Sequence, residues 1–523
     1  MVAARPRGPS KVDLIVVGSG LGGLCAGAIA ARHGLEVLVL EAHTTPGGAA
    51  HGFRRGPFHF ESGPSLWSGL GQWPSTNPLA QVLRAVGESL PVATYRDWGL
   101  LLPEGSLRVG VGQAPFLALL RDLRGPAVAA EWDRFLTALR PSCEAARSLP
   151  LLALRPGAGV ATTLGGGNAL RLLGQAGRLA ALGGAFGPIA RRHLSDPFLL
   201  HWVDLLCFLI SGLPMDQTSA AAMATLFGEW FEPEACLDYP IGGSAAVAAA
   251  LVRGMERHGG RLRTGAAVEE ILVEQGRAVG VRLANGERLE AGLGVIANTS
   301  PWDLVAMLPE AAVPSRWRRR QAATPACAGF LHWHLALRGD DLDHLPIHHV
   351  WVGDWQRGIG AERNMVVLSM PSLLDPSCAP PGHQVLHGYT PANEPWELWQ
   401  GLERGSAAYE ALKRERCAVF GEALERVLPD WRERAVLELQ GTPLTHRHYL
   451  RIHQGSYGPA WPANAGPFPG GSTPVEGLVL CGAGVFPGIG VPPVAVSGAM
   501  AAHRFVGARQ QRQLLEEIGL TPS

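Results

Sequence analysis

Near its start the chain reads Asp13-Leu-Ile-Val-Val-Gly-Ser-Gly-Leu-Gly-Gly23. The β-branched run predicts a buried parallel strand, and it leads directly into a glycine-rich turn. In such a turn Gly18 allows the chain to reverse, Gly20 lets backbone amides approach a pyrophosphate, and Gly23 lets the next helix pack close to the sheet. The pattern therefore predicts a helix whose N-terminus faces an anion.

The next elements extend this pattern into a βαβ unit. A helix is predicted from Leu21 to about His33, and a second strand, Glu36-Val-Leu-Val-Leu40, ends at Glu41, where a carboxylate can bind a ribose 2′-hydroxyl. A lone glycine motif could be an ordinary turn, but strand, helix, strand and acid within about 30 residues are typical of dinucleotide binding. The residues predicted to bind the dinucleotide here are Gly18, Ser19, Gly20, Leu21, Gly22, Gly23 and Glu41.

Length and composition are those of a large α/β enzyme. The chain has 523 residues, of which 47% are apolar and 17% charged, enough for two intertwined domains around a cofactor. Its longest apolar stretch, 198–213, contains His201 and Asp204, so we expect a buried helix rather than a membrane span. Basic and acidic residues number 45 each, which gives no argument for a nucleic-acid partner. The eight scattered cysteines indicate reduced thiols in an intracellular chain.

The segment after Glu41 separates FAD from NAD. It reads Thr45-Pro-Gly-Gly-Ala-Ala-His-Gly-Phe53 and continues through an aromatic strand to Ser65. This sequel resembles the FAD-binding fold of phytoene desaturases, carotenoid isomerases, retinol saturases and, more remotely, amine oxidases. The resemblance implies FAD as cofactor, with contacts at Gly47 and Gly48. It also implies an α/β fold in which a Rossmann-like FAD-binding domain carries an inserted α+β substrate domain.

The resemblance recurs in the middle of the chain. Asp238-Tyr-Pro-Ile-Gly-Gly-Ser244, a helix to His258, and Val268-Glu-Glu-Ile-Leu-Val273 resemble the second FAD-proximal block of the family. There the backbone at the position of Val268 faces the adenine. Two strands, 278–283 and 287–291, are predicted on either side of an Asn-Gly turn, and a separate strand beginning at Val295 resembles the one that returns to the flavin.

A third block lies near the C-terminus. The sequence from Gly477 to Gly498 closely resembles the signature of carotenoid-isomerase-like proteins and implies FAD contacts at Gly482, Ala483, Gly490 and Val491. Ala483 replaces an aspartate that usually contacts the ribityl chain. Ala49 stands where desaturases and amine oxidases often have arginine, which isomerase-like members frequently lack. These departures put one FAD hydrogen bond in doubt and favour the isomerase branch.

The motifs are separated along the chain, so each domain must be assembled from several segments. We predict an FAD domain from 1–70, 235–310 and 470–523, and a substrate-binding, membrane-facing domain from 71–234 and 311–469. Residues 145–195 contain six arginines and no acidic residue. This stretch could lie on an anionic bilayer, or it could pack a substrate cavity with its arginines solvated. The arginines are Arg147, Arg155, Arg171, Arg178, Arg191 and Arg192.

Other polar groups suggest no catalytic residue. His332 and His334 would share one face of a strand, but without diagnostic spacing or an acidic partner we expect ordinary satisfied or exposed histidines and no metal. Glu61 is expected to have a structural hydrogen-bonding role. The residues from His446 to His453 could line a pocket or form a solvated helix face.

The leading hypothesis from the resemblance is cis–trans isomerisation of a carotenoid or related polyene by reduced FAD. The alternatives are desaturation or saturation of a similar substrate, or flavin and carotenoid binding without turnover. We expect a cytoplasmic or plastid-stromal protein in peripheral contact with a membrane, where an apolar polyene dissolves. The sequence identifies no electron donor.

Overall fold

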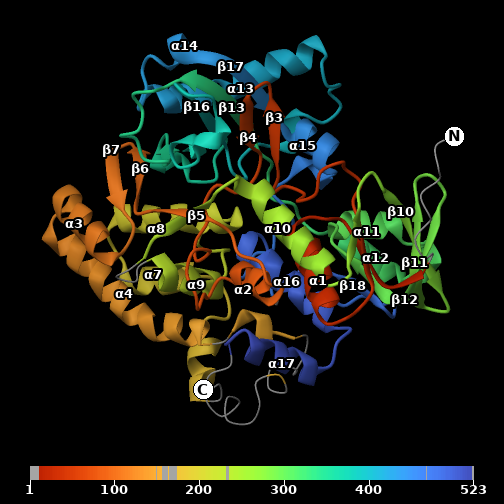
Figure 1. Ribbon diagram of the computed structural model, residues 1–523. Helices are drawn as coiled ribbons and strands as arrows, with labels where there is room; N and C mark the ends of the chain where they lie inside the picture. Colours follow the sequence, from red (N-terminus) through yellow and green to blue (C-terminus); the bar gives the residue numbers. More distant parts are fainter. Residues whose placement is uncertain are drawn as a thin grey trace.

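The computed structural model describes residues 11–148, 150–155, 163, 174–230, 235–466 and 468–520. Two seven-stranded sheets organise the molecule. In Figure 1 the strands of the second sheet lie mainly at the top, and β10, β11 and β12 of the first lie at the right. Helices α1, α10 and α16 lie in the middle, and α3, α4, α7, α8 and α9 gather at the left.

The first sheet has the order β10-β11-β12-β1-β2-β9, and β18 also pairs with β12. β1 pairs in parallel with β2 and β12, whereas β10, β11 and the first part of β12 form an antiparallel meander. All of these strands come from segments predicted for the FAD domain, while the domain boundaries themselves stay predictions. The strands are β1 (Lys11–Val17), β2 (Val37–Leu40), β9 (Arg261–Arg263), β10 (Val268–Glu274), β11 (Arg277–Leu283), β12 (Arg288–Ala297) and β18 (Leu478–Leu480).

Alternation along β1 explains why an apolar run forms a central strand. Leu14 and Val16 pack into the apolar cluster with α1, α10 and α16, whereas Ile15 and Val17 pack into the cluster with β10, β11 and β12. Both faces of the strand are therefore covered, as expected for a parallel strand at the centre of a sheet. Full burial of each such side chain contributes about 1.5–3 kcal/mol of transfer free energy.

The second sheet has the order β17-β13-β16-β15-β14-β6-β7, in which only β14 and β6 pair in parallel. The hairpin β3–β4 and the pair β5–β8 are two further antiparallel ladders, and the second joins residues 92–95 to residues 237–240. These strands are β3 (Gly52–Arg55), β4 (Phe58–Glu61), β5 (Val92–Tyr95), β6 (Asp97–Leu102), β7 (Gly105–Gly110), β8 (Leu237–Pro240), β13 (His332–Arg338), β14 (His348–Val352), β15 (Met365–Ser369), β16 (His383–Tyr389) and β17 (Ala435–Gly441).

Helices cover both sheets. α1 and α16 pack so closely that a Cβ on Gly498 would lie 2.1 Å from the carbonyl oxygen of Gly22. The helices are α1 (Leu21–Arg32), α2 (Pro78–Ala85), α3 (Gln113–Arg124), α4 (Pro126–Arg147), α7 (Gly187–His193), α8 (Pro197–Ser211), α9 (Ala220–Trp230), α10 (Gly243–Arg257), α11 (Pro301–Met307), α12 (Ser315–Ala322), α13 (Ala407–Glu425), α14 (Trp431–Arg434), α15 (Pro443–Leu450), α16 (Val491–His503) and α17 (Ala508–Glu517).

The apolar stretch predicted as a buried helix is α8. Its N-cap Asp196 accepts hydrogen bonds from the backbone of Phe198 and Leu199, and it ends at Gly212 in the left-handed conformation. Most of its apolar side chains pack inside the protein. Across the described residues, we find no helix with the length and apolarity to cross a membrane.

One strand prediction was wrong. The sequence suggested separate strands at 287–291 and from Val295, but β12 runs without interruption from Arg288 to Ala297. Gly292 and Gly294, which interrupt the apolar pattern, are accommodated where β12 pairs with β1 through a register shift between Val12 and Leu14. The extra residue lets one strand serve both the meander and the parallel sheet.

Candidate flavin site

The glycine-rich turn joins β1 to α1 beside the ends of two neighbouring strands. The amide of Gly18 donates to the carbonyl of Leu40, and the amide of Asn298 donates to the carbonyl of Val17, each at 2.8 Å. A Cβ on Gly23 would lie 2.1 Å from the carbonyl oxygen of Gly18. Gly23 is therefore required for the close helix packing that the motif predicted.

Asn298 is a central residue that the sequence did not single out. With its amide oxygen turned towards α1, it accepts hydrogen bonds from the amides of Gly20 and Gly23 at 3.2 and 3.3 Å. A Cβ on Gly22 would lie 2.8 Å from the Asn298 side chain and 3.1 Å from the Cα of Gly482. Asn298 therefore ties the first glycine turn to the C-terminal block. Its position directly after a strand predicted to return to the flavin was the available signal.

Glu41 lies at the end of β2 with its carboxylate held by the glycine turn. One oxygen accepts from the Ser19 amide at 2.8 Å and from the Ser19 hydroxyl at 2.6 Å, and the other accepts from the His43 amide at 2.7 Å. The carbonyl of Glu41 accepts from Ala266 at 2.8 Å, two residues before Val268. The structure thus brings Glu41 and the segment that leads to Val268 together at the end of β2.

The glycine doublet lies against the first turn. Gly47 donates to the carbonyl of Ser19 at 2.9 Å, and a Cβ on Gly48 would lie 2.9 Å from the Cα of Gly20. Only backbone fits between these segments. Ala49, next to the doublet, has an exposed side chain.

The C-terminal block completes the site from the other side. Gly482 and Ala483 follow β18, which pairs with the end of β12 beside Asn298. Gly490, with φ of 114°, is the N-cap of α16, and Val491 is its first residue. The backbone at Gly490 lies near the carbonyl of Ile210 in α8, a helix that packs with strands of the second sheet. The predicted contacts thus extend from the β2 edge towards the substrate region.

These residues fit an FAD-type dinucleotide. Asn298 occupies the amides of Gly20 and Gly23, and the glycine N-caps of α1 and α16 supply no capping side chain, so the other amides of these first turns can face anionic or carbonyl groups. The buried hydroxyl of Thr299, next to Asn298, lacks a hydrogen-bond partner in the described chain. Glu41 supplies the acceptor for a ribose hydroxyl. The donor set therefore suits phosphate, sugar and carbonyl groups.

Glu61 has the structural role expected from the sequence. Its carboxylate accepts from the amide of Ser244 at 3.1 Å, at the start of α10, and Asp375 accepts from the amide of Gly242 at 2.7 Å. Burial raises the pKa of Glu61 to about 7, against the lowering effect of its hydrogen bonds to Ser244. Two carboxyl groups thus support the N-terminus of one helix.

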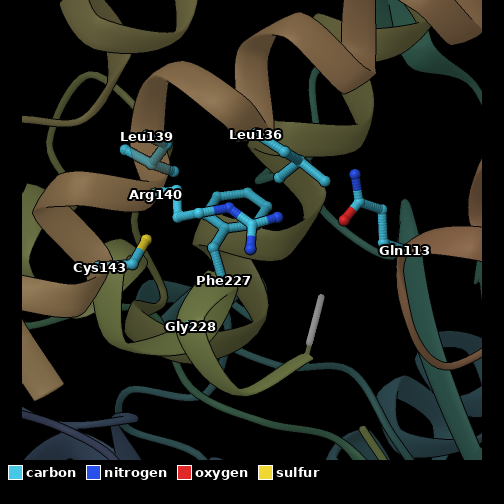
Figure 2. A pocket seen from close by; sticks show the side chains of 7 residues that line it. All are labelled: Gln113, Leu136, Leu139, Arg140, Cys143, Phe227 and Gly228. Carbon is cyan, nitrogen blue, oxygen red and sulfur yellow. The ribbon is translucent and has the colours of Figure 1, made fainter. Parts of the chain in front are cut away.

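Two hollows in the described protein lie away from this site. Figure 2 shows the smaller, where Leu136, Arg140 and Cys143 of α4 face Phe227 of α9, with Gln113 beyond them; its volume is about 20 Å³. The larger, about 280 Å³, lies between the segment 472–479 and Arg504. Neither touches a residue predicted to bind FAD, and the smaller has room for about one water.

Comparisons with known proteins agree with this geometry. An NAD(P)-binding Rossmann-like domain model matches residues 16–83. The chain is 31% identical to the chloroplastic prolycopene isomerase of Daucus carota over 97% of this chain and 82% of that protein. The chain belongs to the carotenoid isomerase and phytoene desaturase family. The neurosporene-forming phytoene desaturase of Rhodobacter capsulatus is 25% identical, over 94% of this chain and 93% of that protein.

A solved structure supports the same fold. Putrescine oxidase bound to putrescine superimposes with a TM-score of 0.63 over 95% of this chain and 99% of that chain, at 16% identity. The α/β fold with a Rossmann-like domain and an additional sheet domain is therefore confirmed. As a member of this family, the chain is an oxidoreductase-type enzyme with a flavin-type cofactor.

Proposed function

We propose that this protein binds FAD and catalyses cis–trans isomerisation of a carotenoid or related polyene with the flavin reduced. The full-length similarity to prolycopene isomerase, at 31% identity over 97% of the chain, carries this proposal. Similarity to the Rhodobacter phytoene desaturase is lower, at 25% over 94% of the chain. The alanine at position 49, in place of the desaturase arginine, supports the same branch.

FAD is favoured because the predicted contacts extend beyond one nucleotide. Glu41 and Val268 would hold the adenosine half, and the first turn of α1 would face the pyrophosphate. Gly482, Ala483, Gly490 and Val491 would hold the flavin half. Asn298, whose side chain contacts both glycine turns, would lie between the two halves.

The protein would contribute orientation and exclusion of water. Reduced FAD, when bound, would supply the electron density needed to lower the bond order of a conjugated double bond and allow rotation. A hydrocarbon substrate would be held by apolar side chains, and α4, α8, α9, β6 and β14 contribute such side chains to one buried cluster. Isomerisation requires no net proton transfer.

Peripheral membrane contact is part of the proposal because the substrate dissolves in lipid. Of the six arginines considered above, Arg178 and Arg192 are exposed, whereas Arg191 pairs with Asp216. Arg171 lies outside the described residues. Exposed arginines with no acidic neighbour in sequence suit an anionic leaflet. We expect the protein on the cytoplasmic or plastid-stromal face of a membrane.

The test uses purified protein carrying FAD and liposomes with a poly-cis carotenoid, incubated without oxygen, with and without dithionite. Chromatography with mass detection should show a new isomer of unchanged mass only after reduction. A product lighter or heavier by two hydrogens would instead identify a desaturase or saturase. Unchanged carotenoid under both conditions, with bound FAD and liposome binding demonstrated, would favour a binding role.

A matched pair of glycine variants ties the activity to the site. G23A inserts a methyl group against the Gly18 carbonyl, whereas a Cβ on Gly470 would have no neighbour within 4 Å, and its φ is not left-handed. Isomerase activity and FAD content should fall together in G23A and stay unchanged in G470A. Activity that persists in FAD-free G23A would contradict a flavin mechanism.

A further inference from the structure

Four histidine side chains meet where the second sheet contacts the β3–β4 hairpin. His332 and His334 come from β13, His387 lies opposite His334 on β16, and His446 comes from α15. The centroids of the His334 and His387 rings are 4.9 Å apart, as are those of His332 and His387, and those of His332 and His446 are 4.6 Å apart. His332, His334 and His387 are all buried.

The polar atoms of this histidine cluster are only partly satisfied. His332 Nδ1 and His387 Nε2 share a hydrogen bond of 2.7 Å, and His334 Nε2 lies 2.9 Å from the carbonyl oxygen of Glu61. Within the described chain, His332 Nε2, His387 Nδ1 and His446 Nδ1 have no hydrogen-bond partner. Among the described residues, each of these three rings therefore keeps one nitrogen without a hydrogen-bond partner.

One nitrogen from each of His332, His334 and His387 lies within 4.8 Å of the others. We propose that these three side chains bind a divalent transition-metal ion. A set of imidazoles without carboxylates suits Zn²⁺, Fe²⁺, Ni²⁺ or Cu²⁺ rather than Mg²⁺ or Ca²⁺. The fourth position is left for hydroxide or chloride from solvent, to which the Nδ1 of His446 can donate.

The hydrogen bond from His334 also follows the pattern of metal sites. A ligating histidine commonly donates its second N–H to a backbone carbonyl, which orients the ring. Here His334 Nε2 can donate to the Glu61 carbonyl, leaving Nδ1 for the metal.

Metal binding requires a small movement of the other two rings. With metal–nitrogen bonds of about 2.0–2.1 Å, tetrahedral ligands lie about 3.4 Å apart. The bond between His332 and His387 must therefore open, and its proton must move to the outer nitrogen of the same neutral ring. The three rings therefore release no proton, and a water that binds as hydroxide gives one proton to solvent.

The site goes beyond the proposed function because it is separate from the predicted flavin contacts. Phe53 and Phe60 pack their rings against His334, with centroids 4.9 and 5.6 Å away. His51, on the loop before the hairpin, lies 2.8 Å from the carbonyl oxygen of Gly48 through its Nδ1. The ion would stabilise the contact between the hairpin and the second sheet, next to the glycine doublet.

The test measures metal directly on the full chain. Wild type, H387Q and the control H448Q, whose altered side chain is exposed on the same helix as His446, are stripped with chelator, loaded with Zn²⁺ and gel-filtered. Elemental analysis should give equimolar zinc in wild type and H448Q. H387Q should bind zinc more weakly by at least the roughly 10–100-fold typical of losing a second-shell partner. FAD absorbance in the same samples separates metal loss from flavin loss.

Two results would overturn the proposal: wild type retains only trace zinc, or H387Q retains as much as wild type. If H387Q does not fold, Co²⁺ added to flavin-free wild type provides the second readout. Intense visible bands that Zn²⁺ abolishes and Mg²⁺ does not would support the site. The weak spectrum of hydrated Co²⁺ would contradict it.

Discussion

The two large sheets build their polar centres in different ways. Beside the first sheet, the centre consists mainly of closely packed backbone, in which Gly18, Gly23 and Gly48 leave no room for a Cβ. Beside the second, it consists of side chains from distant segments, including the histidine cluster and the ion pair between Glu394 and Arg416. The centre beside the first sheet should therefore lose stability when atoms are added to it. The centre beside the second sheet should lose stability when one of its paired side chains is removed.

The largest effect is expected where a buried charge loses its partner. The Glu394 carboxylate, fully buried, accepts from Arg416 at 2.8 Å and from Trp399 at 2.8 Å. E394Q leaves the guanidinium of Arg416 with only the half-exposed Glu362, so the free energy of unfolding should fall by about 3–5 kcal/mol. Denaturant titration measures it. The control D216N, which breaks the exposed pair with Arg191, should cost less than about 1 kcal/mol. Equal losses of unfolding free energy in E394Q and D216N would contradict the claim that the buried ion pair matters more than the exposed one.

Adding one methyl group tests the first sheet. G23A should lower the free energy of unfolding by about 1–3 kcal/mol, because the new Cβ would overlap the Gly18 carbonyl and α1 must move. G470A should stay within about 0.5 kcal/mol of wild type. Thermal and denaturant unfolding of both variants provides the comparison, and an unaffected G23A would show that α1 can shift freely.

A charge placed between the glycine turns should weaken the cofactor more than the fold. N298D puts a carboxylate against the amides of Gly20 and Gly23, near the expected pyrophosphate. FAD affinity should fall about tenfold, equivalent to about 1.4 kcal/mol. N285D is the matched control, since Asn285 only accepts from the Glu287 amide in an exposed turn. Fluorescence titration of the flavin-free protein measures both, and unchanged affinity in N298D would place the pyrophosphate elsewhere.

The smallest expected effect is a pH dependence that originates in the second sheet. In the unfolded chain histidine titrates near pH 6.5, whereas burial lowers the pKa of His334 to about 4. The folded protein thus binds fewer protons between these values, and stability present above pH 6.5 is lost as the pH falls towards 4. Each such histidine should cost about 1 kcal/mol between pH 6.5 and 5.5.

Glu61 acts in the opposite direction, because its raised pKa of about 7 makes its contribution decrease as the pH rises. Denaturation in chelator across this range should show a shallower slope for H334N than for wild type. Identical slopes would mean that His334 has the same pKa in the folded protein as in the unfolded chain.

The sequence predicted the βαβ geometry beside the first sheet well because its signals are local. Gly18, Gly23 and Glu41 lie within one βαβ unit, and their spacing alone requires a turn, a close helix and an acid at a strand end. It missed Asn298, which has no local motif and becomes important only when β1 and β12 pair. The roles of the individual FAD contacts stay predictions.

The second sheet was less predictable because its contacts are distant. The shared face of His332 and His334 follows from strand periodicity. His387 lies opposite His334 only because of the register between β13 and β16. Its hydrogen bond with His332 joins residues 55 positions apart in the sequence. Similarly, the cluster predicted near His446 is divided: His446 Nδ1 is buried, whereas His448 and Tyr449 are exposed.

The most direct test of the proposed reaction counts electrons. Protein whose FAD has been reduced once, without oxygen or further reductant, is given a large excess of poly-cis carotenoid, and flavin absorbance is followed with product mass. Isomerisation predicts many product molecules of unchanged mass per flavin, with the flavin still reduced at the end. If product never exceeds one molecule per flavin, its mass changes by two hydrogens and the flavin becomes oxidised, the reaction is a net reduction and the account is contradicted.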